Sequence, residues 1–273
     1  MTYDIAVETL LCRYKEIYKS KGNSPDWATP KTDGSGLVHP SIPFVGKDYF
    51  NQPVKILMYA SAENLNGYNG YLDDDALAIN RHRAHFDYSK ENNDGFPNVH
   101  IQPINNGALV ICAFHILSKL MPVEDCSPAV FLEKISFGNY GKYTIDTKDT
   151  GKNSDYADKP EKLCESQKYI KADIEILQPD YIIMVKQMYS GKGKQKAFID
   201  ELQCVAKVIP IPQVNAGNIN RGKAFGTCED VDIDSLHPTV KRWFPKCKET
   251  SAVKHFLRVF YHLDKVMQQV IEQ

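Results

Sequence analysis

"VKILMYASAENLNGYNGYLDDD", residues 54–75, is the stretch that decides the expected fold. Its first seven residues have the length and the apolar composition of a buried β-strand. The residues that follow are small or polar, and they include a carboxylate, Glu63, and two amides, Asn64 and Asn66. Because ligands of open α/β sheets bind where the strands end, these side chains are the first candidates for a functional site.

Strands and helices alternate along the rest of the chain. The expected strands are 54–60, a segment within 129–140, 181–185 and 205–211, and the expected helices are 3–20, 105–121, 161–177, 192–203 and a last one after residue 250. Such alternation predicts a parallel sheet that is covered by helices on both faces. We expect a single domain over 1–273, in which residues 1–50 form an N-terminal helix and loop extension.

Composition excludes several classes of protein. The 33 basic and 34 acidic residues nearly cancel, so no overall charge attracts the chain to nucleic acid or to anionic lipid. No apolar run is long enough to cross a membrane, and residues 1–17 resemble an amphipathic helix more than a signal peptide. The seven Cys are scattered without a CxxC pair, which indicates free thiols and argues against structural zinc. We therefore expect a soluble cytoplasmic protein without a metal or another cofactor.

Four pieces of the chain resemble the uracil-DNA glycosylase superfamily. They are "VKILMYASAEN" (54–64), "ISFGNYGKY" (135–143), "CESQKYIKADIEILQPDYIIMV" (164–185) and "HPT" (237–239). The resemblance implies a three-layer α/β/α fold with a central four-stranded parallel sheet. It also implies that the protein hydrolyses the bond between a base and its sugar in DNA.

The resemblance assigns roles to individual residues. Glu63 lies where the family has its activating Asp or Asn, and His237 matches the His of the family's last loop, so these two are the expected catalytic residues. The expected base-binding residues are Asn64, Asn66, Tyr68, Phe137 and Asn139. "QVNAGNINR" lies where the family's last loop should begin, so a residue between Gln213 and Asn218 is an alternative to His237.

A basic and aromatic segment, "TVKRWFPKCK" (239–248), follows the His-Pro pair. Four basic residues without an acid flank Trp243 and Phe244, a mixture that suits phosphate contacts and a wedge in a base stack. The expected DNA-binding residues are Lys142, Arg221, Lys241, Arg242 and Trp243.

The resemblance implies a monofunctional DNA glycosylase that acts on a flipped pyrimidine, and we expect it to act as a monomer. Where the uracil enzymes of the resembled family have a bulky Tyr against the five-position of the base, this chain has "NLNGYNG" (64–70), rich in small residues. The comparison implies a roomy pocket for a five-substituted base, such as a modified phage base in antiviral defence. An ordinary uracil repair enzyme is one alternative, and a non-catalytic nucleic-acid-binding protein of the same fold is another. An unrelated α/β hydrolase or nucleotide-binding enzyme is disfavoured, because GxSxG, GxGxxG and GxxxxGK[ST] are absent.

Overall fold

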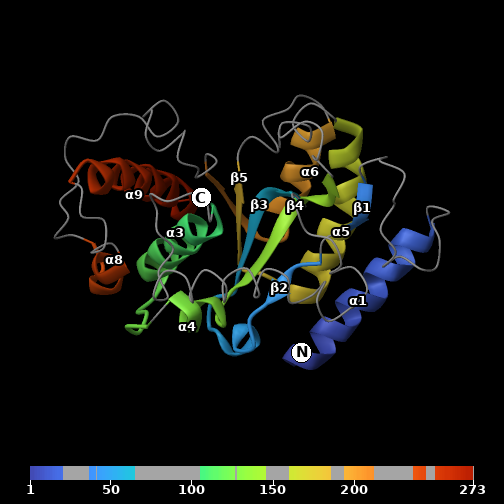
Figure 1. Cartoon of the computed structure of the whole chain (residues 1–273), viewed down its shortest axis with the longest axis horizontal. Helices are drawn as coiled ribbons and strands as arrows, with labels where there is room; N and C mark the ends of the chain where they lie inside the picture. The colour runs from blue at the N-terminus through green and yellow to red at the C-terminus, as the bar shows by residue number, and fades with distance from the viewer. Residues whose placement is uncertain are drawn as a thin grey trace.

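The computed structural model describes residues 1–20, 37–40, 42–64, 105–126, 128–145, 160–185, 194–211, 236–243 and 250–272. One sheet runs through the molecule, and helices pack on both of its faces (Figure 1). The strands are β1 (Leu37–Pro40), β2 (Phe44–Val45), β3 (Ile56–Asn64), β4 (Ser136–Ile145), β5 (Tyr181–Val185) and β6 (Lys207–Ile211). The helices are α1 (Tyr3–Ser20), the 3₁₀ turn η1 (Tyr49–Asn51), α3 (Asn105–Leu120), α4 (Pro128–Leu132), α5 (Pro160–Leu177), α6 (Lys194–Gln203), α8 (Pro238–Trp243) and α9 (Thr250–Ile271).

The sheet is mixed, with the strand order β1-β4-β3-β5-β6 and with β2 also paired to β4. The pairs β4–β3, β3–β5 and β5–β6 are parallel, whereas β1 and β2 run antiparallel to β4. The expectation of a purely parallel four-stranded sheet was therefore wrong. Its four strands are present, but residues 37–45 add two short strands beside them, and strands of two and four residues carry too little periodicity to be predicted.

One aspartate aligns the amino ends of three parallel strands. The main-chain N–H of Lys55 donates to Asp180 Oδ2 at 2.7 Å, and the N–H of Asp180 donates to the Lys55 carbonyl at 2.9 Å. The N–H of Lys207 in turn donates to the Asp180 carbonyl at 3.0 Å. These bonds set the register in which Ile56 pairs with Tyr181, and Tyr181 with Lys207, so the carboxyl ends of the strands lie along one edge.

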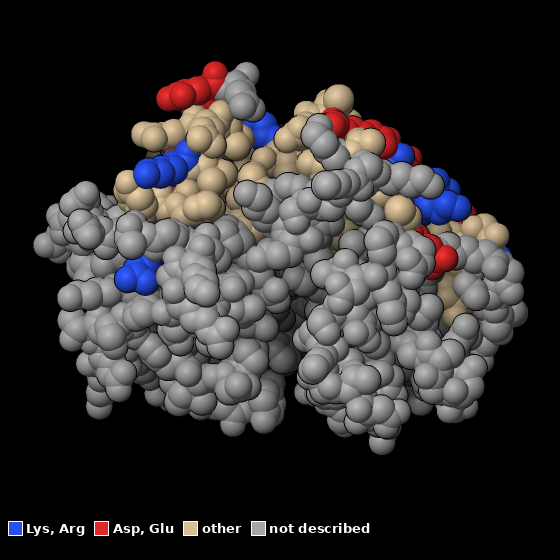
Figure 2. Space-filling model, turned by 90° about the horizontal axis from the view of Figure 1, so that it is seen from above, with Lys and Arg blue, Asp and Glu red and all other residues tan. Residues whose placement is uncertain are grey.

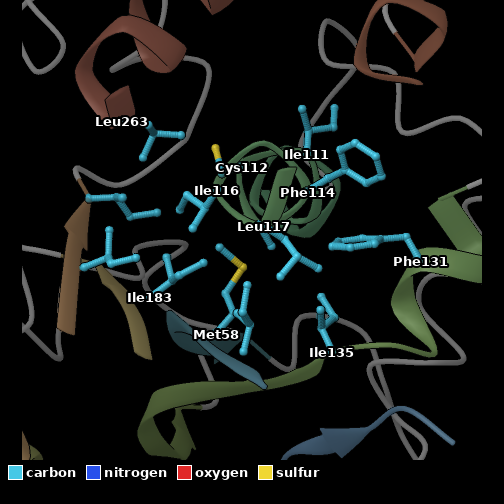
Figure 3. Packing of buried hydrophobic residues seen from close by; sticks show 14 of the residues in the cluster. Met58, Ile111, Cys112, Phe114, Ile116, Leu117, Phe131, Ile135, Ile183 and Leu263 are labelled. Carbon is cyan, nitrogen blue, oxygen red and sulfur yellow. The ribbon is translucent and has the colours of Figure 1, made fainter. Parts of the chain in front are cut away.

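The first face of the sheet is covered by α3, α4, α8 and α9. The segment of α3 from Ile111 to Leu117 is buried on every side, as its nearly continuous apolar sequence predicts (Figure 3). Phe114 packs edge-on against Phe131 of α4, with ring centroids 4.9 Å apart. This apolar layer, which also contains Phe137 of β4, holds α3 against the first face of the sheet.

The second face of the sheet is covered by α1, α5 and α6. Helix α1 buries Ala6, Leu10, Tyr14 and Tyr18, which recur every four residues and so share one stripe. Tyr14 packs against Tyr169 of α5 with ring centroids 4.8 Å apart. The N-terminal helix is thus an integral part of the core.

Element boundaries follow the sequence where local signals are strong. Helix α5 ends at Leu177, before "QPD" as predicted, and Gln178 adopts a left-handed conformation (φ 47°). The N–H of Gln178 donates to the Ile174 carbonyl at 2.9 Å and so satisfies one carbonyl of the last turn. Strand β3, by contrast, continues four residues beyond the predicted 54–60, so Glu63 and Asn64 belong to the strand and not to a loop.

Candidate functional site

The candidate site is built around the carboxyl ends of β3 and β4. Ala60 pairs with Asn139 and Ala62 with Gly141 in the parallel ladder between these strands. Glu63 follows Ala62 directly, so its main chain lies one residue beyond the last regular pair. Two of the segments that carry the resemblance, 54–64 and 135–143, are therefore neighbours in the sheet, although 75 residues separate Asn64 and Asn139 in the chain.

Asn139 is a buried amide on the face of the sheet covered by α3. Successive side chains of a strand alternate between faces, so Asn139 shares the face of Phe137, which packs in the apolar layer around α3. Asn139 retains 3% of its exposed surface. Phe137 retains none, so the structure offers no ring surface there on which a base could stack, and the role predicted for this residue has no support.

His237 lies on the same side of the sheet as Asn139, at the start of α8. Its ring meets the Phe114 ring of α3 edge-on, with centroids 5.2 Å apart. The N–H of Thr239 donates to His237 Nδ1 at 3.2 Å, and the Thr239 hydroxyl donates to Asp125 Oδ1 at 2.5 Å. His237 thus acts as the N-cap of α8, and Asp125 holds this turn against the segment between α3 and α4.

The bond to Thr239 also determines which ring nitrogen of His237 carries the proton. A nitrogen that accepts an N–H bond must present its lone pair, so Nδ1 is unprotonated. The proton of the neutral ring is then on Nε2, which can donate to an acceptor. His237 is half-buried, so its environment is neither fully hydrated nor fully apolar.

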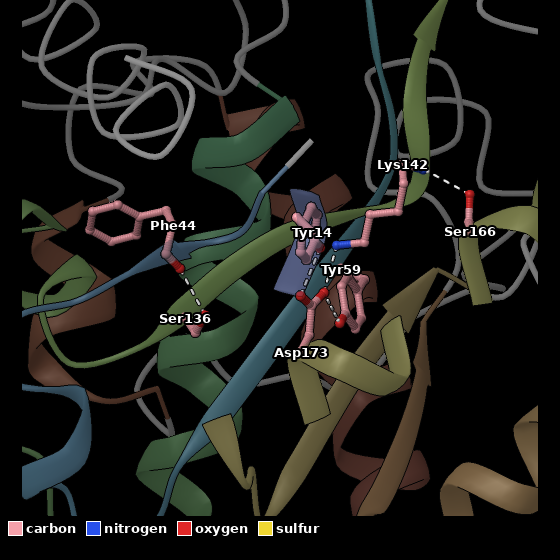
Figure 4. A network of polar contacts seen from close by, with 7 residues as sticks. All are labelled: Tyr14, Phe44, Tyr59, Ser136, Lys142, Ser166 and Asp173. Carbon is pink, nitrogen blue, oxygen red and sulfur yellow. Dashed lines mark hydrogen bonds and ion pairs between the residues drawn. The ribbon is translucent and has the colours of Figure 1, made fainter. Parts of the chain in front are cut away.

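Lys142 does not reach the surface, and its predicted contact with DNA is wrong. Its side chain is fully buried on the second face of the sheet and forms an ion pair with Asp173 of α5, with Nζ 2.6 Å from Oδ2 (Figure 4). Tyr14 donates to Asp173 Oδ1 and Tyr59 to Oδ2, both at 2.7 Å. A solvated phosphate cannot compete for a lysine whose partners are all inside the protein.

Burial outweighs attraction within this ion pair. Burial raises the pKa of Asp173, although Lys142 and the two tyrosine hydroxyls lower it. Burial likewise lowers the pKa of Lys142, although Asp173 raises it. Burial and the neighbouring Asp173 together raise the pKa values of Tyr14 and Tyr59, so both phenols remain protonated donors.

Sequence reasoning missed Asp173, although a signal was present. Asp173 follows Tyr169 and Ile170 of α5 and precedes Leu177 at helical spacing, so it lies on the apolar stripe of the helix. An acid on a buried stripe needs a buried cation or several donors. Lys142, 31 residues away, provides the cation.

Several predicted residues cannot be compared with side-chain geometry. Asn66, Tyr68, Arg221 and the alternative segment 213–218 lie outside the described residues. Only main-chain positions are described for Glu63 and Asn64 in β3, and for Lys241, Arg242 and Trp243 in α8. In Figure 2, the coloured part of the surface carries basic and acidic residues side by side.

In the described part of the chain, no three His, Cys, Asp or Glu side chains gather as metal ligands would. No helix within those ranges combines the length and the apolar character needed to cross a bilayer.

No family model matches the chain, and comparisons with curated proteins and with solved structures found no match either.

Proposed function

We propose that this protein is a monofunctional DNA glycosylase, a divergent relative of the uracil-DNA glycosylases, which removes a flipped pyrimidine and leaves an abasic site. The observation that carries the proposal is the hydrogen bond at His237: the Thr239 N–H donates to Nδ1, so the proton of the neutral ring lies on Nε2, from which it can be donated to a base oxygen. The parallel order β4-β3-β5-β6 and the buried amide of Asn139 support it.

The proposed chemistry matches the residue types at the site. Cleavage of a base–sugar bond passes through an oxocarbenium-like sugar, while negative charge collects on the departing base. The Nε2–H of His237 would stabilise that charge at a base oxygen, and Asn139 would read the base edge. Glu63 would orient the water that attacks the sugar carbon and would stabilise its positive charge.

The substrate that we propose is a pyrimidine with a polar substituent at its five-position. Asn64 at the end of β3, together with Asn66, would bind this substituent, since each amide offers both a donor and an acceptor. An unsubstituted base would leave buried amides without partners, which is costly. Plain uracil is the alternative substrate, and it would make the protein an ordinary repair enzyme.

A panel of modified DNAs tests the proposal. The purified protein is incubated with duplex and single-stranded DNA that contains uracil, hydroxymethylcytosine or sugar-modified cytosine, and abasic sites are scored as alkali-labile breaks. Excision of a five-substituted base would support the whole proposal. Excision of uracil alone would contradict the proposed roomy pocket and indicate an ordinary repair enzyme. No excision from any DNA, with DNA binding retained, favours the non-catalytic nucleic-acid-binding protein.

Variants of His237 and Glu63 test the mechanism. In His237→Asn the new side chain can still accept the Thr239 N–H and cap α8, but it lacks Nε2–H. We expect this variant to fold normally and to lose about 10²- to 10³-fold in kcat, the usual cost of one such donor. Glu63→Gln should lose about 10²- to 10⁴-fold. Near-wild-type turnover of either variant would remove that residue from the mechanism.

A further inference from the structure

The pairing of β3 with β4 becomes irregular at Lys142. Ala62 pairs with Gly141, but the next pair joins Asn64 to Ile145. Two steps along β3 therefore correspond to four steps along β4, and the extra residues form a bulge that begins at Lys142. Glu63 is the residue of β3 that lies opposite this bulge. Bulges next to active sites commonly change the direction in which a side chain points.

Helix α5 holds this bulge at two points. The main-chain N–H of Lys142 donates to Ser166 Oγ at 3.0 Å, and its ammonium group contacts Asp173 at 2.6 Å. Ser166 and Asp173 are seven residues apart, so they lie on the same stripe of the helix two turns from one another. All three side chains are fully buried, so water does not compete for these bonds.

The same carboxylate also holds β3. Tyr59, four residues before Glu63, donates to the Asp173 oxygen that Lys142 contacts. The Lys142 ammonium lies 5.0 Å from the centroid of the Tyr59 ring, so the two side chains pack against one another. Asp173 therefore joins both strands that carry the candidate site, while Tyr14 joins it to α1 through the other oxygen (Figure 4).

We propose that Lys142 is a positioning residue: anchored to Ser166 and Asp173, it fixes the bulge that sets the place of Glu63. The inference rests on the proposed function, in which Glu63 orients water. A displacement of about 1 Å at such a group can cost about 10²-fold in rate. Such a positioning role gives a reason for the buried ion pair between Lys142 and Asp173 at this point of β4.

Hydrogen exchange tests the anchor without relying on activity. Ser166→Ala and Lys142→Met each remove one attachment of the bulge, and Tyr14→Phe is the matched control, because it removes a bond to the same carboxylate from α1. We expect exchange at the amides of Glu63 and Asn64 to rise about tenfold in Ser166→Ala, the effect of one lost hydrogen bond, while exchange at Leu57 and Met58, near the start of β3, should change less. Lys142→Met also destabilises the whole fold, so its exchange should rise along all of β3 and most at Glu63 and Asn64.

Uniform acceleration along β3 in Ser166→Ala, or a selective rise at Glu63 and Asn64 in Tyr14→Phe, would overturn the inference. Ser166→Ala keeps the test valid should Lys142→Met fail to fold. Hydrogen exchange does not depend on base excision. If the wild-type protein excised no base, the proposed function would be contradicted, but exchange would still test whether Ser166 and Asp173 hold the bulge.

Steady-state kinetics then separate positioning from general stability. Ser166→Ala should lower kcat by about 10- to 100-fold and leave KM within about twofold, because the misplaced group acts in the transition state. Tyr14→Phe should leave both constants near the wild-type values. Unchanged kcat in Ser166→Ala, on a substrate that the wild type excises, would show that the bulge does not position Glu63.

Discussion

Lys142→Met and Asp173→Asn should destabilise the protein with opposite dependences on pH. Both side chains are fully buried and in contact at 2.6 Å, so each substitution leaves one unpaired ionisable group inside the core. Removing one partner of such a pair costs about 3–5 kcal/mol of unfolding free energy. Lys142→Met should lie near the lower end, since Asp173 keeps its bonds from Tyr14 and Tyr59.

The opposite pH dependences of the two variants follow from the pKa shifts of Asp173 and Lys142. Burial raises the pKa of Asp173, and Lys142→Met removes the lysine that lowers it, so the folded pKa rises further. The folded state then keeps a proton that the unfolded state loses above about pH 4. The stability of Lys142→Met should therefore fall relative to wild type as pH rises through the folded pKa, by up to about 1.4 kcal/mol per pH unit.

Asp173→Asn behaves in the opposite way. Burial lowers the pKa of Lys142, and the substitution removes the carboxylate that raises it. The unfolded state then binds a proton, up to its pKa of about 10.4, that the folded state does not bind. The stability of this variant should rise with pH relative to wild type.

Urea unfolding at steps from about pH 5 to about pH 9 measures both slopes. The double variant Lys142→Met/Asp173→Asn is the control. It carries neither ionisable group, so its unfolding free energy should show neither pH dependence. Its loss of unfolding free energy should also be smaller than the sum of the losses of the two single variants. Parallel pH curves for the two single variants would refute the assignment of a buried, mutually compensating pair.

Three further outcomes are expected. Gly46→Ala should cost about 1–3 kcal/mol in urea unfolding, because an added Cβ would overlap the main chain just before β4. Burial raises the pKa of Asp264, but the hydrogen bonds and charges of His115 and Lys119 together lower it more, so the net pKa is lowered. Relative to Asp264→Asn, the stability of the wild type should therefore fall by up to about 1 kcal/mol as pH decreases from about 4 through that lowered pKa, a small effect because the carboxylate is half-exposed. Lys241→Ala and Arg242→Ala should each flatten the salt dependence of DNA binding by about one unit of slope, and unchanged slopes in salt titrations would place them away from the phosphates.

The sequence by itself determined the helices and strands whose apolar residues form a regular pattern within one segment. The i, i+4 stripe of α1, the apolar run of α3 and the stop after Leu177 are local patterns, and all three appear in the structure. The alternation of strands and helices likewise predicted the four parallel strands.

The tertiary structure alone decided which residues meet. Lys142 was predicted to contact DNA, whereas it is buried because α5 places Asp173 beside it. The short strands β1 and β2 exist only because β4 offers them an edge. A buried charge or an edge strand is stable only with a partner from another element, and local periodicity carries no information about that partner.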